Sequence, residues 1–124
     1  MEQKFFICEH CGKIVALVKE SGVPVMCCGQ KMKEIIPGTV EASKEKHIPV
    51  YTKEGNKVTV KVGEVDHPML PEHYIEWVSL QTKSGNQRKA LKPGDKPEVC
   101  FLVCEDDEIE AVYAYCNLHS LWKK

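Results

Sequence analysis

Cysteine and histidine are the residue types in this chain that could bind a metal ion, and there are seven cysteines and five histidines. Four cysteines fall within the first 28 residues, and the other three begin only at position 100. Four of the histidines lie in the later part of the chain. Cysteines at this density, in a sequence without a visible export signal, are typical of metal ligands rather than disulfides. The sequence therefore predicts metal chemistry in two groups of residues.

The first group consists of Cys8, Cys11, Cys27 and Cys28. A Cys-x-x-Cys turn lets two thiolates converge on one ion, and the 15 residues between Cys11 and Cys27 let the chain return with the second pair. We expect a tetrahedral site for iron or zinc, with a purely structural zinc as the alternative. Neighbouring strand residues point to opposite faces, so the Cys27-Cys28 pair needs a distorted turn, which Gly29 suits. His10 is surplus to a filled site and should be exposed.

The second group consists of His47, His67, His73, Cys116 and His119. Each histidine taken singly would more often be a surface or core residue. Two of them lie on one Pro-stiffened loop, HPMLPEH, and a cysteine and a histidine lie three residues apart in CNLH. If these loops meet, four nitrogens and one sulfur converge, which fits neither common zinc pattern. The set leaves a sixth octahedral position open, as in a redox iron that binds a small oxygen species, and the thiolate would push electron density towards that ligand.

Two units must position these groups, with a boundary at the loop-like residues 37–39. Residues 1–36 are too few to bury a stabilising core, so a metal bound to the four cysteines is expected to stabilise this unit. Residues 37–124 contain frequent period-two apolar runs and no helical period of useful length. Short strands with turn signals at this spacing predict an immunoglobulin-like β-sandwich, so the whole chain is expected to be all-β.

Individual strands are predicted within the second unit. Valines alternate over 58–62 after a Gly55-Asn56 turn that suits a hairpin. A strand is expected over 74–80 with Ile75 and Trp77 on its buried face, and another over 87–91. Residues 99–104 include apolar side chains at both odd and even positions, which is typical of a central strand with two buried faces. The last long strand is expected to run over 109–115 into Cys116.

Cys100 and Cys104 belong to neither metal group. On one strand their Cα atoms would lie roughly 13 Å apart, whereas a disulfide needs less than about 7 Å. We therefore expect two small, buried apolar side chains rather than a bridge.

Composition limits the function classes. The chain has 124 residues, 43% of them hydrophobic, which excludes disorder. There are 17 basic and 18 acidic residues, so no basic surplus indicates nucleic acid or an anionic membrane as a partner. No apolar run approaches the roughly 20 residues of a membrane span, and no signal-type segment follows Met1, so a cytoplasmic protein is expected.

The motifs together carry a resemblance to a known family. CEHCG with a later CCG, then EKHIPV, HPM with EHYIEW, KPGD and YCNLH resemble desulfoferrodoxin, the two-iron superoxide reductase family, in order over the whole chain. The resemblance implies a desulforedoxin-like iron domain over 1–36 and an immunoglobulin-like catalytic domain over 37–124. It implies two irons per chain, one held by the four thiolates and a catalytic one held by four equatorial imidazoles and the axial Cys116.

The resemblance also implies a reaction, partners and further residues. Superoxide would be reduced by one electron to hydrogen peroxide at the open ferrous position, and rubredoxin or a similar protein would restore the electron to a homodimeric enzyme. Glu45 matches the carboxylate that occupies the sixth position of the oxidised iron, and Lys46 matches the lysine beside the open site. Ser120 departs from the family, which commonly has glycine there; a positive φ would strain serine.

Two alternatives from other classes remain open. The chain could be an electron carrier that uses both irons as relays without catalysis, which steady peroxide production from superoxide would exclude. It could also be a zinc-dependent binding module, which a coloured protein would exclude. The sequence also leaves open whether the first iron relays electrons or only holds the dimer.

Overall fold

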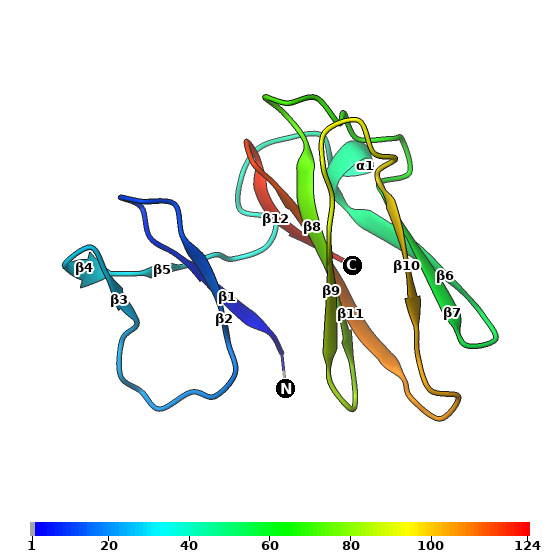
Figure 1. The fold of residues 1–124 in the computed structure, drawn as a ribbon, viewed down its shortest axis with the longest axis horizontal. Coiled ribbons are helices and arrows are strands. Elements are labelled where there is room, and N and C mark those ends of the chain that lie inside the picture. Colours follow the sequence, from blue (N-terminus) through cyan, green and yellow to red (C-terminus); the bar gives the residue numbers. More distant parts are fainter. Residues whose placement is uncertain (1) are drawn as a thin grey trace. The chain divides into compact units, whose positions relative to one another are not determined.

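The computed structural model describes residues 2–124, which form two compact units, Met1–Ile36 and Pro37–Lys124 (Figure 1). Both units are built from strands. The one helix among the described residues, α1 (Lys44–His47), has four residues. The prediction of an all-β chain is therefore confirmed.

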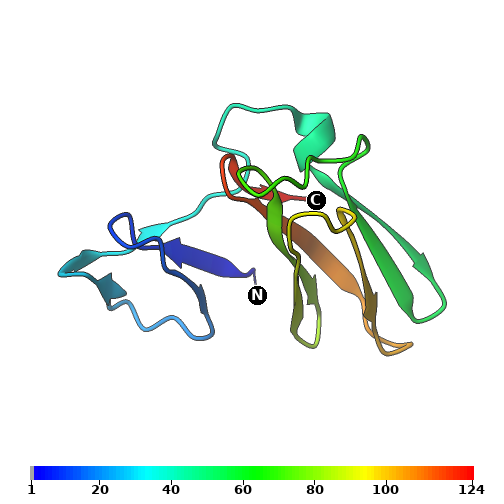
Figure 2. The same cartoon turned by 45° about the horizontal axis from the view of Figure 1, so that its top comes forward.

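The first unit contains one sheet and one small hairpin. Its antiparallel sheet has the order β2-β1-β5, with β1 (Lys4–Ile7), β2 (Ile14–Leu17) and β5 (Lys33–Glu34). The hairpin pairs β3 (Met26–Cys27) with β4 (Gln30–Lys31) (Figure 2). The buried hydrophobic side chains among residues 2–36 are Phe5, Cys8, Met32 and Ile35. So small a core needs a further stabilising element.

The second unit is a sandwich of two antiparallel sheets. One sheet has the order β10-β7-β6, with β6 (Pro49–Glu54), β7 (Lys57–Val62) and β10 (Glu98–Leu102). The other has the order β12-β11-β8-β9, with β8 (Ile75–Thr82), β9 (Asn86–Ala90), β11 (Ile109–Cys116) and β12 (Ser120–Lys123). Seven strands in two layers agree with the predicted immunoglobulin-like architecture.

A hydrophobic core fills the space between the two sheets. Its buried members are Val58, Val60, Val62, Ile75, Val78, Leu80, Val99, Phe101, Val103, Val112, Ala114 and Cys116. The alternation of the three valines confirms the predicted hairpin strand, and Gly55 forms its turn at a φ of 59°. Because Cys116 is itself part of this core, its thiol is held at the end of a rigid strand.

The expectation that Ile75 and Trp77 share a buried face is wrong. Ile75 is fully buried opposite Cys116, whereas Trp77 is half-buried and stacks on Tyr115 with ring centroids 5.5 Å apart. The register between β8 and β11 shifts at this point, so two residues of β8 advance against one of β11. Such an irregularity moves the buried face from the odd-numbered to the even-numbered residues of β8, so burial continues at Val78.

The prediction for residues 99–104 is wrong in two respects. The strand β10 lies at a sheet edge, and its Leu102 side chain is 73% exposed. Cys100 is only half-buried, with its Sγ 3.7 Å from the Thr59 hydroxyl, and Cys104 lies beyond the strand and is exposed. An edge strand is partly open to solvent, so apolar residues at both odd and even positions are not all buried here. Both thiols are free, as expected.

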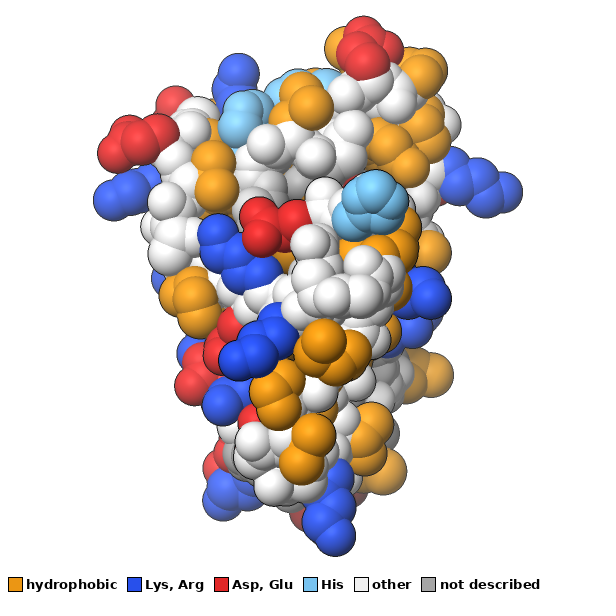
Figure 3. All heavy atoms as spheres, turned by 90° about the vertical axis from the view of Figure 1, so that its left-hand side faces the viewer, with side chains coloured by type: hydrophobic (Ala, Val, Ile, Leu, Met, Phe, Trp, Pro, Cys, Tyr) orange, Lys and Arg blue, Asp and Glu red, His pale blue; other side chains and the backbone are white. Residues whose placement is uncertain are grey.

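The exposed side chains carry both signs of charge. Figure 3 shows basic, acidic and hydrophobic side chains interspersed over the face drawn. An anion that approaches this face is attracted by local groups rather than by one large positive patch. No helix among residues 2–124 is both long and apolar enough to cross a lipid bilayer.

Candidate metal centres

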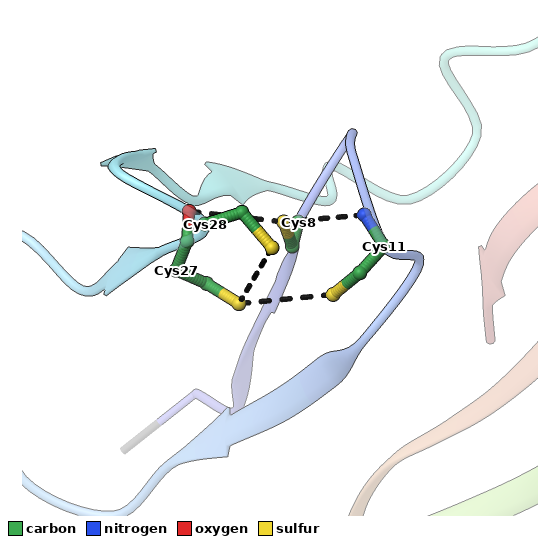
Figure 4. A group of neighbouring side chains, drawn as sticks. All are labelled: Cys8, Cys11, Cys27 and Cys28. Atoms are coloured by element: carbon green, nitrogen blue, oxygen red, sulfur yellow. Dashed lines mark hydrogen bonds between the residues drawn. The ribbon is translucent and has the colours of Figure 1, made fainter.

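The four cysteines of the first unit form one compact cluster (Figure 4). Cys8 directly follows β1, Cys11 lies in the turn after it, Cys27 ends β3, and Cys28 lies in the β3–β4 turn. Their sulfurs all lie within 4.8 Å of one another. The Cys11–Cys27 and Cys27–Cys28 sulfur distances are 3.7 and 3.8 Å. Metal–sulfur bonds of about 2.3 Å give a tetrahedron with an edge of about 3.8 Å, so the cluster fits a four-thiolate metal site.

Backbone geometry explains how vicinal cysteines share a site. Cys28 and Gly29 both adopt the left-handed conformation, with φ values of 52° and 73°. This pair of residues reverses the chain, so the two thiols point to the same side, and the predicted distorted turn is confirmed. On the other side of the cluster, the Cys11 amide donates to the Cys8 sulfur at 3.5 Å. His10 is exposed, as expected.

Electrostatics within this cluster favour a bound cation. Hydrogen bonding from the Cys11 amide lowers the pKa of Cys8 to about 6. Hydrogen bonds with the neighbouring thiols, that of Cys11 first, raise the pKa of Cys28 to about 12. The first proton therefore leaves easily and the last one is retained, because four thiolates cannot share this space without a compensating charge. A metal ion supplies that charge.

The second group of ligands gathers at one end of the sandwich. His47 ends α1, His67 and His73 lie in the connection from β7 to β8, Cys116 ends β11, and His119 lies in the turn to β12. The ligand atoms of His47, His67, His73 and Cys116 lie within 4.8 Å of one another. His119 joins them through its Nδ1, which lies 3.1 Å from the His47 Nε2 and 3.9 Å from the Cys116 sulfur.

Backbone carbonyls fix the tautomers of two of these histidines. The Nδ1 atoms of His47 and His67 each lie 2.7 Å from a carbonyl oxygen, that of Ser43 and that of Pro68. A carbonyl only accepts, so each Nδ1 carries the proton and each Nε2 presents a lone pair. These two Nε2 atoms lie 3.0 Å apart. Two lone pairs repel at this distance unless a cation lies between them, and metal–nitrogen bonds of about 2.1 Å at right angles give this separation.

His73 adds an independent indication of a metal. Its Nε2 is buried and has no hydrogen-bond partner among the described residues. A buried polar atom without a partner calls for a ligand, and a metal ion satisfies a lone pair at this position. Burial lowers the pKa of His47 and His73, and it lowers that of His67 to about 4. These three imidazoles are therefore neutral at pH 7, as metal binding requires.

Cys116 is placed to supply a buried sulfur ligand. Its side chain is fully buried, and burial raises the pKa of the thiol. A cation bound to the sulfur reverses this preference and stabilises the thiolate. Together, four imidazole nitrogens and one thiolate form a donor set that suits a redox-active iron better than magnesium or calcium, which prefer oxygen ligands.

Asn117 is a site residue that the sequence did not predict. Its side-chain oxygen accepts the Tyr74 backbone N–H at 2.9 Å, and its side-chain nitrogen donates to the Glu72 carbonyl at 3.0 Å. The amide therefore ties the segment that carries His73 to the turn that follows Cys116. The position of asparagine inside CNLH was the only available signal, because hydrogen bonds between distant segments leave no periodicity in the sequence.

Glu45 and Lys46, which directly precede His47, are exposed on α1. Burial is the main cause of the lowered pKa of His73; the charge of His119 lowers it further, that of Glu72 opposes the shift, and that of Lys46 adds the smallest lowering. Lys46 thus carries an exposed positive charge directly before His47 in the sequence. The Glu45 side chain lines a surface pocket together with Lys44, Ile48, Val50, Glu64 and Lys124.

The chain is similar to known proteins over nearly its whole length. Residues 39–124 match the family model described as Desulfoferrodoxin. The chain is 47% identical to a desulfoferrodoxin homolog from Archaeoglobus fulgidus, over 94% of this chain and 91% of that one. It is 42% identical to desulfoferrodoxin from Nitratidesulfovibrio vulgaris, over 98% and 95% of the two chains. The fold is similar to the superoxide reductase from Treponema pallidum, with a TM-score of 0.85, 42% identity and coverage of 100% and 99%.

Proposed function

The chain belongs to the desulfoferrodoxin family, and from this membership we propose that it is a superoxide reductase that reduces superoxide to hydrogen peroxide. The observation that carries the proposal is the convergence of four imidazoles and one buried thiol at one end of the sandwich. These residues would hold an iron, which would supply one-electron chemistry to a small anion such as superoxide.

We assign one iron of the family to each unit. Cys8, Cys11, Cys27 and Cys28 are proposed to hold the first iron in a desulforedoxin-like domain, residues 1–36. His47, His67, His73, Cys116 and His119 are proposed to hold the catalytic iron in the domain of residues 37–124. The assignment is supported by the division of the chain, because each ligand set comes entirely from one unit.

When bound, ferrous iron would supply the one electron that, together with two protons, converts superoxide to hydrogen peroxide without release of dioxygen. The protein residues prepare the site for this step. The carbonyls of Ser43 and Pro68 orient two imidazoles, and the core holds Cys116 at a fixed depth. Because these groups are already in place, little reorganisation is needed when the anion arrives.

Lys46 and Glu45 are the residues proposed to handle the anion and the product. Lys46 is exposed next to a ligand histidine, so its charge attracts superoxide locally and orders water as a proton source. Glu45 is proposed to be the residue whose carboxylate would bind the catalytic iron once peroxide has left. Lys46 is therefore expected to affect the rate of encounter, and Glu45 the resting oxidised state.

Partners are proposed as follows. Each turnover oxidises the iron, so an external one-electron donor is required, and a rubredoxin-like iron protein suits this role. A homodimer is proposed, and the exposed hydrophobic side chains of Val18, Val23 and Met26 in the first unit are candidates for the subunit contact. A cytoplasmic location is also proposed, because cysteines at this density are assigned here as metal ligands rather than as disulfides.

The decisive experiment measures product stoichiometry. The iron-loaded protein is supplied with a steady superoxide flux and a reduced rubredoxin-type donor, while peroxide, dioxygen and donor oxidation are followed. A reductase gives one peroxide and one oxidised donor for each superoxide, with no dioxygen. Cys116→Ser serves as the control. Donor oxidation without matching peroxide would favour an electron carrier, and a colourless zinc protein would favour a binding module.

A further inference from the structure

The backbone directly after the last ligand histidine is strained. Ser120 has a φ of 65°, and Cys28 is the only other non-glycine residue with a positive φ among residues 2–124. The left-handed conformation brings a β-carbon close to the backbone, which disfavours it for serine. Ser120 nevertheless adopts it where β12 begins, paired with Cys116 in the register of β11 and β12.

A simple local movement would relieve this strain. If the peptide group between His119 and Ser120 turned over, the φ of Ser120 would change sign. The same rotation changes the ψ of His119 and turns its carbonyl oxygen to the opposite side. A change in the φ of Ser120 that the ψ of His119 does not fully offset moves the Cα of His119 relative to β12, and with it the imidazole Nδ1 that lies 3.1 Å from His47 and 3.9 Å from Cys116. Something must hold the peptide group in place.

Trp122 contacts the carbonyl group that would have to turn. Its indole Nε1–H donates to the carbonyl oxygen of His119 at 2.9 Å. The indole is 3% exposed and lies on β12 opposite Ala114 of β11, so it cannot follow a moving peptide. Its ring centroid also lies 5.0 Å from that of His47. One side chain thus contacts two ligands that are 72 positions apart in the sequence.

We propose that Trp122 is a positioning residue that locks the His119–Ser120 peptide in its strained orientation and so holds the His119 imidazole on the metal. The inference rests on the proposed metal site but not on the reaction with superoxide. The strain at Ser120 and the hydrogen bond of Trp122 act on the same peptide group. The two residues should therefore be coupled rather than additive.

The test is a double-mutant cycle on the full-length, iron-loaded chain. The four proteins are the wild type, Trp122→Phe, Ser120→Gly and the double variant. The readout is the rate at which a chelator removes iron from the second site, followed by the thiolate-to-iron absorption of Cys116. A net hydrogen bond corresponds to about a three- to tenfold change. We expect Trp122→Phe to accelerate release by about this factor in the serine background, and by less than about twofold in the Ser120→Gly background.

Two further proteins separate positioning from packing. Site-specific replacement of Trp122 by benzothienylalanine keeps the ring and removes only the N–H donor, and it should reproduce the effect of Trp122→Phe. This variant also serves if Trp122→Phe does not fold. Trp77→Phe is the matched control, since Trp77 stacks on Tyr115 rather than on a ligand, and it should change release by less than about twofold.

The outcomes distinguish this inference from the proposed site. Equal acceleration in both backgrounds, or no effect of removing the N–H donor, would overturn the role of Trp122 and leave the metal site intact. Absence of the thiolate-to-iron absorption from the wild-type protein would instead overturn the metal site itself. Faster iron release on loss of the N–H donor, confined to the serine background, would establish that Trp122 holds the His119–Ser120 peptide in place.

Discussion

The carbonyl oxygen of Glu45 lies 2.6 Å from the point at which a β-carbon on Gly63 would be placed. The Ile48 carbonyl oxygen lies 2.8 Å from the same point. The Glu45 carbonyl also accepts the backbone N–H of Val65 at 3.0 Å. The helix α1, which ends in the ligand His47, therefore packs directly on the backbone that follows β7, and only glycine leaves room for it.

Gly63→Ala should displace α1 and disturb the second metal site. Both opposing atoms belong to the backbone, so no side-chain rotation can make space, and overpacking of this kind costs about 1–3 kcal/mol. We expect a lower unfolding temperature and a shifted absorption of the histidine-ligated iron. Gly85→Ala is the control, because a β-carbon there meets nothing within 4 Å. Identical melting and spectra for the two variants would contradict the packing argument.

Lys46→Ala should slow the reaction with superoxide and weaken its dependence on salt. The lysine is exposed on α1, and at 0.1 M ionic strength charges act over about 10 Å, so a local cation contributes to the encounter rate. The measurement is the second-order rate from pulse radiolysis at two ionic strengths. Lys57→Ala, at the start of β7 and the opposite end of that strand from the site, is the control. Unchanged rate and salt slope would make Lys46 an ordinary surface lysine.

Those parts of the fold and site that depend on local chemistry were predictable from the sequence. The alternating valines of 58–62 indicate a strand with one buried face because side chains alternate along any strand. Cys27 and Cys28, followed by Gly29, indicate a distorted turn because two neighbouring thiols cannot otherwise point together. Residue types and spacings likewise predicted the two groups of cysteines and histidines that the structure brings together, since few other roles explain so many of them.

The features that depend on contacts between distant segments were not predictable in this way. The four-residue helix α1 is too short to show an apolar period. Trp77 leaves the core face because of a register shift against β11, which depends on the partner strand. Trp122 reads as one more apolar residue of a strand, and only the structure shows its N–H on the His119 carbonyl. His119 uses Nδ1 where His47 and His67 use Nε2, a choice made by the surrounding backbone.

Asp107 should give the sandwich an acid-sensitive stability. Its carboxylate accepts hydrogen bonds from the hydroxyls of Ser84 and Thr82 at 2.6 and 2.7 Å and from the Glu108 amide at 3.0 Å. These bonds, those of Ser84 first, lower the pKa of Asp107. The folded pKa lies below the unfolded one, so the stabilisation is fully present above the unfolded pKa and is lost as pH falls through the folded pKa.

Asp107→Asn should therefore lower the unfolding temperature at neutral pH and flatten its decline in acid. Asp106→Asn removes a charge from the same turn and serves as the control. Thermal unfolding of the three proteins is measured from pH 7 to pH 3. A parallel acid decline in the wild type and in Asp107→Asn would show that other carboxylates govern the acid sensitivity.

Substitution of one ligand in each group should remove one metal at a time. We expect two irons per chain in the native protein, because the described residues contain two such groups. Cys28→Ser should lose the first iron and keep the absorption of the histidine-ligated one, whereas Cys116→Ser should show the reverse. Metal analysis with visible spectra tests this. Stoichiometric zinc at the histidine site of native protein would refute the assignment; zinc at the thiolate site after overexpression would not.

The two units should also have separate roles, with the reaction confined to the second unit. A truncated chain that begins at Pro37 contains the complete second ligand set together with Glu45 and Lys46. Its 88 residues (124 minus 36) include the core of the sandwich, so it should fold alone, because metal staples become necessary only below about 40 residues. Four hydrophobic side chains are buried among residues 2–36, so the first unit should fold only with metal, and the free energy of metal binding is then its folding free energy.

We expect the ferrous truncated chain to be oxidised by superoxide in a single turnover at a rate close to that of the full chain. The chemistry requires an iron, its five ligands and an approaching anion, and all five proposed ligands come from the second unit. Stopped-flow mixing with superoxide measures the rise of the ferric absorption and the peroxide yield, with the truncated Cys116→Ser chain as the control. If a folded, iron-loaded truncated chain failed to react, the four-thiolate centre would have to take part in the electron transfer, and a relay role would replace the structural one.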